Sequence, residues 1–132
     1  MQDIALNILA HAGAALVATC LGATVIAARK GTPLHRLLGW LWVACLVIVS
    51  VTAAFIQTLN PGGFSLLHLL IPVTLGALAL AIWSIRRFKR TGLNGYRHTH
   101  ASAMICVFAG GLLIAGSLAL LPGRSMHTLI FG

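Results

Sequence analysis

The chain has 132 residues, of which 59% are apolar and only 8% are charged, with a formal net charge of +8. Soluble domains carry roughly a quarter of their residues as charged ones, so a soluble fold of this length could not bury so much hydrocarbon. The composition predicts one integral membrane domain, residues 1–132. Because Asp3 is the only acidic residue, catalysis by paired carboxylates and oxygen-rich calcium or magnesium sites are excluded.

Four apolar segments are each long enough to cross a bilayer as a helix, which takes about 20 residues. We expect these spans at residues 4–28, 34–59, 64–85 and 97–121. In the turn between the first two spans, we expect Thr32 as helix N-cap and Pro33 as the first helical residue. Asn60-Pro61-Gly62-Gly63 should form the turn between the second and third spans. Short connections make consecutive helices antiparallel neighbours. The expected fold class is therefore all-α, an antiparallel four-helix membrane bundle.

The cations gather in the two loops at one end of the expected bundle, and only Arg124 lies elsewhere. They are Arg29, Lys30, Arg36, Arg86, Arg87, Lys89, Arg90 and Arg97. This bias follows the positive-inside rule and predicts cytoplasmic basic loops, with both chain termini outside. The loops could also attract anionic lipid headgroups. No nucleic-acid partner is expected, because the cations do not gather on a polar module.

Each apolar segment carries a histidine near one of its ends. His11 and His68 lie in the outer halves of the first and third segments, and His35 and His100 lie near the cytoplasmic ends of the second and fourth. In an up-down bundle these histidines form two diagonal pairs, one toward each membrane face. Such a pair can supply both axial ligands of a haem iron. We expect two bis-histidine haem b groups, which would carry electrons across or into the bilayer.

Small residues follow the histidines at helical spacing and would leave room for a flat cofactor. Ala15, Ala18 and Gly22 follow His11, and Gly111 follows His100. The same residues would equally permit tight helix–helix contact. The haem propionates would need cationic partners, with Arg124 expected on the outer side and Arg36 or Arg97 on the inner side. His98 would replace His100 as ligand if the fourth helix were rotated.

Two other interpretations of the histidines stay open. A copper or zinc site could use His11 and His68 or the second pair, His35 and His100, but two imidazoles leave coordination incomplete without a third ligand or a second chain. A non-catalytic membrane subunit would hold the histidines at headgroup level. The three cysteines lie on separate segments without Cys-x-x-Cys spacing, and we expect them to be free.

A set of ordered motifs extends over nearly the whole chain: His35-Arg36-Leu37-Leu38-Gly39, Phe64-Ser65-Leu66-Leu67-His68, His100 with Met104, and Pro122-Gly123-Arg124. In this set the chain resembles a family of predicted bacterial four-helix membrane proteins of unknown function. The resemblance implies a multi-pass protein of the bacterial cytoplasmic (inner) membrane.

In the pairing of its histidines, though not in a motif, the chain is also similar to the di-haem transmembrane cytochromes b. That similarity implies a transmembrane oxidoreductase supplied by a quinol or another small reductant. Such a protein would work as a homo-oligomer or as an accessory subunit of a redox complex.

Overall fold

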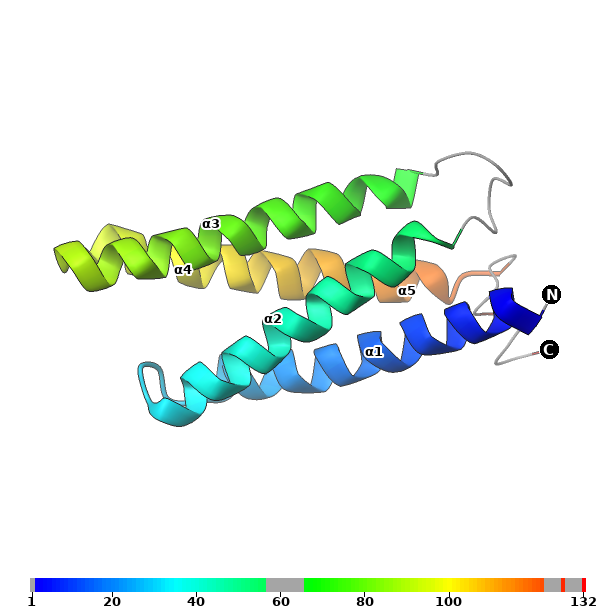
Figure 1. Ribbon diagram of the computed structural model, residues 1–132, viewed down its shortest axis with the longest axis horizontal. Helices are drawn as coiled ribbons and strands as arrows, with labels where there is room; N and C mark the ends of the chain where they lie inside the picture. The colour runs from blue at the N-terminus through cyan, green and yellow to red at the C-terminus, as the bar shows by residue number, and fades with distance from the viewer. Residues whose placement is uncertain (1, 57–65, 123–126, 128–131) are drawn as a thin grey trace.

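The computed structural model describes residues 2–56, 66–122, 127 and 132, and these residues contain helices but no strand. The elements are α1 (Gln2–Ala27), α2 (Pro33–Ala54), η1 (Leu66–Leu69), α3 (Leu70–Thr91), α4 (Asn94–Cys106), η2 (Val107–Ile114) and α5 (Ala115–Ala119). The last three follow one another without a break, so the described chain forms four long rods (Figure 1). All four are long and apolar enough to cross a membrane. The protein is an all-helical, multi-pass membrane protein in contact with the lipid bilayer.

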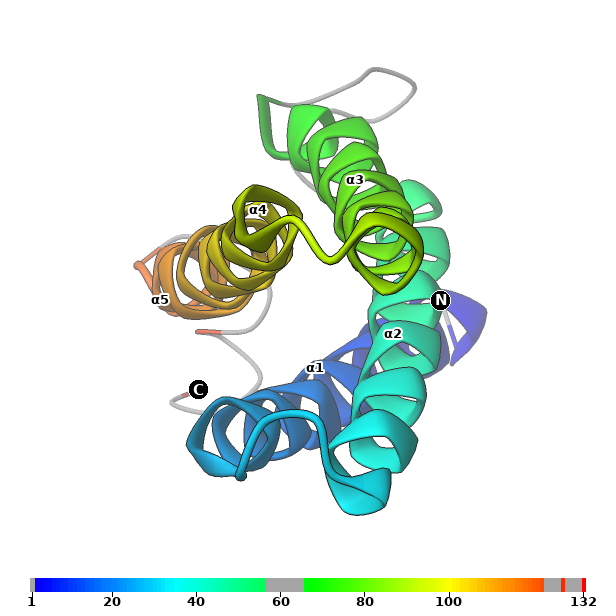
Figure 2. The ribbon, with the colours of Figure 1, turned by 90° about the vertical axis from the view of Figure 1, so that its left-hand side faces the viewer.

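The rods form two antiparallel hairpins. α1 packs along α2, and α3 packs along α4, whereas the hairpins meet more sparsely, through α2 with α3 and through α1 with η2. Viewed from the end where both hairpins turn, the helices follow one another in chain order around the bundle (Figure 2). Helices α1 and α3 are therefore diagonal partners, as are α2 and α4, which confirms the expected arrangement.

The hairpin turns are closed by local hydrogen bonds. The Thr32 hydroxyl accepts from the His35 backbone N–H at 3.1 Å, and Pro33 begins α2, as the sequence predicts. The Lys30 ammonium group donates to the carbonyl oxygens of Ile26, in the last turn of α1, and of Ala28, just after it. The last carbonyls of a helix have no partner within the helix, so such bonds help to end it. Gly92 ends α3 at a φ of 70°, a conformation open to glycine at little steric cost, and its N–H bonds to the Phe88 carbonyl at 2.8 Å.

Several helix ends differ from the expected spans. α3 continues to Thr91 instead of ending at residue 85, so the basic residues 86–90 are helical. Arginine and lysine are good helix formers, and their long side chains can carry the charges beyond the apolar layer. α4 begins at Asn94, three residues earlier than expected, and α2 ends at Ala54 instead of residue 59. Residues 57–63, with the expected second turn, lie outside the described residues.

The core is centred on Trp42, whose side chain is fully buried. Its ring meets that of Phe108 edge to face, with centroids 6.1 Å apart. A Cβ added at Gly22 would lie 2.6 Å from Phe108 and 2.8 Å from Trp42, so this crossing requires glycine. Large apolar side chains elsewhere face outward, including Leu16 and Phe55, because lipid surrounds the bundle in place of water. Trp42 thus closes the centre of the bundle, about 10 Å along the helix axis from His35.

Candidate functional site

Histidines from all four rods reach partly buried positions. His11 on α1, His35 on α2, His68 in η1 and His100 on α4 are half-buried, whereas His98 is exposed. The rotation of α4 therefore turns His100, rather than His98, toward the rest of the bundle.

His35 and His100 lie on diagonal helices, at the end of the bundle where both hairpins turn. Their rings are close enough to interact electrostatically. His100 Nδ1 lies 2.9 Å from the Ala81 carbonyl oxygen on α3. A carbonyl oxygen only accepts, so we assign the proton to Nδ1, which leaves Nε2 of the neutral ring with a free lone pair. Metal-ligating histidines are commonly held by a bond of this kind to their other ring nitrogen.

Three buried polar atoms of α2 and α3 have no hydrogen-bond partner among the described residues. They are His35 Nδ1, Trp42 Nε1 and Ser84 Oγ. The His35 ring lies near the Val25 carbonyl group, but its Nδ1 makes no hydrogen bond. Buried polar atoms nearly always have partners, so His35 Nδ1 is a candidate for binding a group that the chain does not supply.

His11 makes a hydrogen bond that the sequence did not indicate. His11 Nδ1 lies 3.0 Å from the hydroxyl oxygen of Thr52 on α2, an adjacent helix. The Thr52 hydroxyl lies 2.8 Å from the Ile48 carbonyl and can donate its one proton there. The hydroxyl oxygen then accepts from His11 Nδ1–H, so Nε2 of this ring also keeps its lone pair.

His68 lies in a 3₁₀ turn rather than in the third α-helix, where it was expected. Proline causes this difference. Pro72 has no N–H to donate to the His68 carbonyl four residues earlier, and its ring crowds that carbonyl. The chain therefore winds more tightly over Leu66–Leu69 and begins α3 at Leu70.

Arginines lie close in the sequence to both histidines. Arg36 and Arg97 are exposed at the same end of the bundle as His35 and His100. Asp3, the only acidic residue, lies at the start of α1, at the other end of that helix. The end of the bundle with the hairpin turns therefore has no carboxylate side chain of its own to neutralise these guanidinium groups. Arg124, the expected outer partner, lies outside the described residues.

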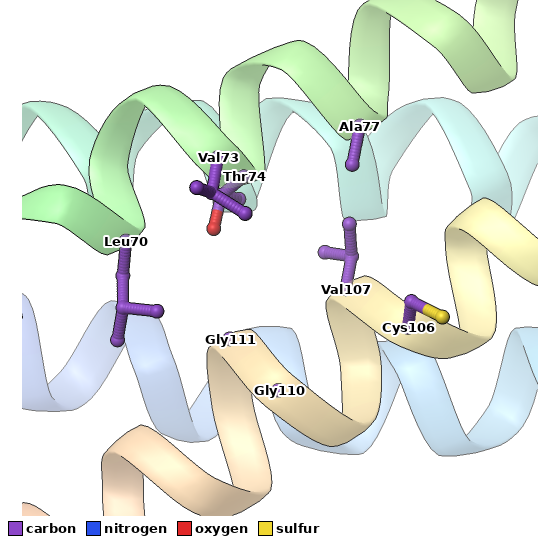
Figure 3. Close-up of a pocket in the computed structure, with 8 residues that line it drawn as sticks. All are labelled: Leu70, Val73, Thr74, Ala77, Cys106, Val107, Gly110 and Gly111. Carbon is purple, nitrogen blue, oxygen red and sulfur yellow. The ribbon is translucent and has the colours of Figure 1, made fainter.

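A cavity of about 90 Å³ lies away from the histidines, between α3 and the part of the fourth rod formed by α4 and η2 (Figure 3). Small-molecule pockets are typically about 300–1,000 Å³, so this one is small. The donor set of His35 and His100, with one imidazole from each of two helices, suits bis-imidazole ligation of a haem iron.

The described residues contain no group of three or more His, Cys, Asp or Glu side chains that could hold a metal ion. Cys20, Cys45 and Cys106 are free and lie on three different rods.

No curated protein and no solved structure matches the chain. One family pattern does match, over residues 8–128, which include every histidine of the chain. Its description is a predicted membrane protein, in agreement with the four spanning helices. The chain belongs to this family, the predicted membrane proteins named DUF2306.

Proposed function

We propose that this protein is a b-type haem electron carrier of the bacterial cytoplasmic membrane. The observation that supports it best is the pairing of His35 with His100. Two half-buried imidazoles on diagonal helices lie at the same end of the bundle, near enough to interact electrostatically. One has its proton committed to a backbone carbonyl, and the other has a buried nitrogen without a hydrogen-bond partner.

Each residue of the site has a separate role in this proposal. The Ala81 carbonyl fixes the ring of His100 and raises the basicity of its Nε2. Arg36 and Arg97 would offset the charges of two propionates at the cytoplasmic surface by charge-assisted hydrogen bonds. When bound, haem supplies one-electron transfer at its iron.

The proposal extends to a second haem at the outer level, held by His11 and His68 with Arg124 near the propionates. His11 supports it, because Thr52 fixes the tautomer that leaves Nε2 available. Two haems at two depths would form a path for electrons across the bilayer. A quinol or another small reductant would then supply electrons, and the protein would act as a transmembrane oxidoreductase.

An absorption spectrum tests the proposal. The full chain, expressed with ample haem and purified in detergent, should show a Soret band and an alpha band that sharpens with dithionite. His35→Ala and His100→Ala should each remove the cytoplasmic haem. His98→Ala is the matched control, since this exposed histidine lies two residues from His100. Wild-type protein without a Soret band would rule the proposal out.

The same preparation distinguishes the two alternatives. A copper or zinc site on these histidines would need a third ligand from a second copy of the chain. Metal analysis of tag-free protein would then give copper or zinc in proportion to protein, without a Soret band. A non-catalytic membrane subunit would contain neither, and replacement of all four histidines would leave its fold and partners unchanged.

A further inference from the structure

The cavity between α3 and the fourth rod is a crevice that opens sideways. Its walls are formed by Leu70, Val73, Thr74, Ala77, Cys106, Val107, Gly110 and Gly111 (Figure 3). No residue of α1 or α2 contributes to it, and Val73 and Cys106 are exposed. Because apolar side chains of these spans face lipid, the crevice is reached from the membrane.

Thr74 supplies the only side-chain hydroxyl of the crevice. The other threonines of the described residues direct their hydroxyls to backbone carbonyls nearby: Thr19, Thr24, Thr32, Thr52, Thr91 and Thr99. Within the described part of the chain, Thr74 has no such bond. Figure 3 shows its oxygen directed across the crevice toward the fourth rod. An unpaired hydroxyl in an apolar medium is costly, so this one favours a ligand with an acceptor.

Part of the opposite wall carries no side chain. It belongs to η2, a stretch of π-helix, which often occurs at functional sites. A Cβ at Gly110 would meet no atom within 4 Å, and a Cβ at Gly111 would lie 3.4 Å from Thr74 Oγ1. The two glycines thus leave a flat surface opposite the hydroxyl.

We infer that this crevice binds the ring of a membrane-soluble quinone, with one ring carbonyl accepting a hydrogen bond from Thr74 Oγ1. A charged ligand would find no counter-charge among the lining residues. A lipid acyl chain would fill apolar space but could not use the hydroxyl. Because the crevice opens to the side, only the edge of the ring that carries the carbonyl needs to enter it, while the isoprenoid tail remains in the surrounding lipid. The inference names a substrate class for the proposed electron carrier and rests on that function, but binding itself needs no haem.

Protection from photolabelling tests the inference on the full chain in lipid nanodiscs. An azido-ubiquinone should label crevice peptides of α3 and η2, and decylubiquinone should protect them, whereas decylbenzene, which lacks carbonyls, should not. Thr74→Val should raise the half-protecting concentration about tenfold, the effect of one lost hydrogen bond. Thr24→Val, which removes a hydroxyl bonded within α1, should leave it unchanged. Equal protection in wild type and Thr74→Val would overturn the inference.

A second variant fills the space instead of removing the hydroxyl. Gly110→Leu places a side chain in the crevice, where its Cβ meets no neighbour within 4 Å, and should abolish labelling while the protein stays folded. Labelling that persists in this folded variant would also overturn the inference. The two proposals fail separately: quinone labelling without a Soret band would reject haem alone, and a Soret band with labelling unchanged in both variants would reject this site alone.

Discussion

His11 on α1 and Thr52 on α2 are joined by a hydrogen bond of 3.0 Å between Nδ1 and Oγ1. The bond links residues 41 positions apart and connects the two helices of the first hairpin in the half away from its turn. His100 is joined to Ala81 of the neighbouring helix in the second hairpin. Each hairpin therefore fixes one imidazole by its Nδ1 and leaves Nε2 for another partner.

Thr52→Val should destabilise the protein modestly. Valine keeps the shape of threonine but leaves His11 Nδ1 without its partner, and hydrogen bonds between membrane helices average about 0.6 kcal/mol, with a maximum near 1.7 kcal/mol. The matched control is Thr24→Val, because that hydroxyl bonds only within its own helix. Thermal unfolding in one detergent should give a lower Tm for Thr52→Val than for Thr24→Val. Equal Tm values would show that the bond contributes nothing to stability.

Gly22→Ala should destabilise the protein more than the addition of a methyl group to an apolar helix usually does. Its Cβ would lie 2.6 Å from the Phe108 ring and 2.8 Å from Trp42, and overpacking of this kind costs about 1–3 kcal/mol. Gly13→Ala in the same helix meets no atom within 4 Å and should be neutral or slightly stabilising. Phe108→Leu should partly restore the Tm of Gly22→Ala. A Gly22→Ala protein as stable as Gly13→Ala would contradict the packing at this crossing.

The sequence predicted what depends on local rules. The lengths of the apolar segments predicted four spans, and Thr32 and Pro33 predicted the start of α2. The short loops predicted that the helices follow one another around the bundle in chain order. Helix ends were less predictable, because hydropathy follows apolar residues and α3 continues through basic residues 86–90 as far as Thr91. The 3₁₀ turn at His68 did have a local signal, the proline four residues later.

The partners of the candidate site could not be predicted from the sequence. Thr52 meets His11, and Ala81 meets His100, only because the helices of each hairpin pack in one register. The crevice beside Thr74 depends on the π-helical stretch opposite it, which no sequence pattern indicated. The sequence predicted toward which end of its helix each histidine lies, whereas their hydrogen bonds depend on a hydroxyl and a backbone carbonyl of adjacent helices.

Cysteine labelling should establish the orientation in the membrane. Asn94 and Leu121 are exposed at opposite ends of the fourth rod. In a chain whose native cysteines are replaced by alanine, Asn94→Cys should resist a membrane-impermeant maleimide in intact spheroplasts and react after lysis. Leu121→Cys should react in both, because the positive-inside rule places the basic loops in the cytoplasm. The reverse labelling pattern would place the basic loops, with His35 and His100, on the outer side of the membrane.

His100→Asn should separate the structural role of this histidine from its proposed ligand role. The asparagine amide N–H can replace Nδ1–H as donor to the Ala81 carbonyl, but asparagine offers no imidazole nitrogen to a haem iron. The variant should unfold close to the wild-type Tm and yet lose the absorption of the cytoplasmic haem. His100→Ala should lose both the absorption and about 1 kcal/mol of stability, since it leaves no donor for that carbonyl. Dithionite difference spectra and thermal unfolding on the same samples measure the two effects, with exposed His98→Asn as the control. A His100→Asn protein that keeps full haem absorption would remove His100 from the ligand set.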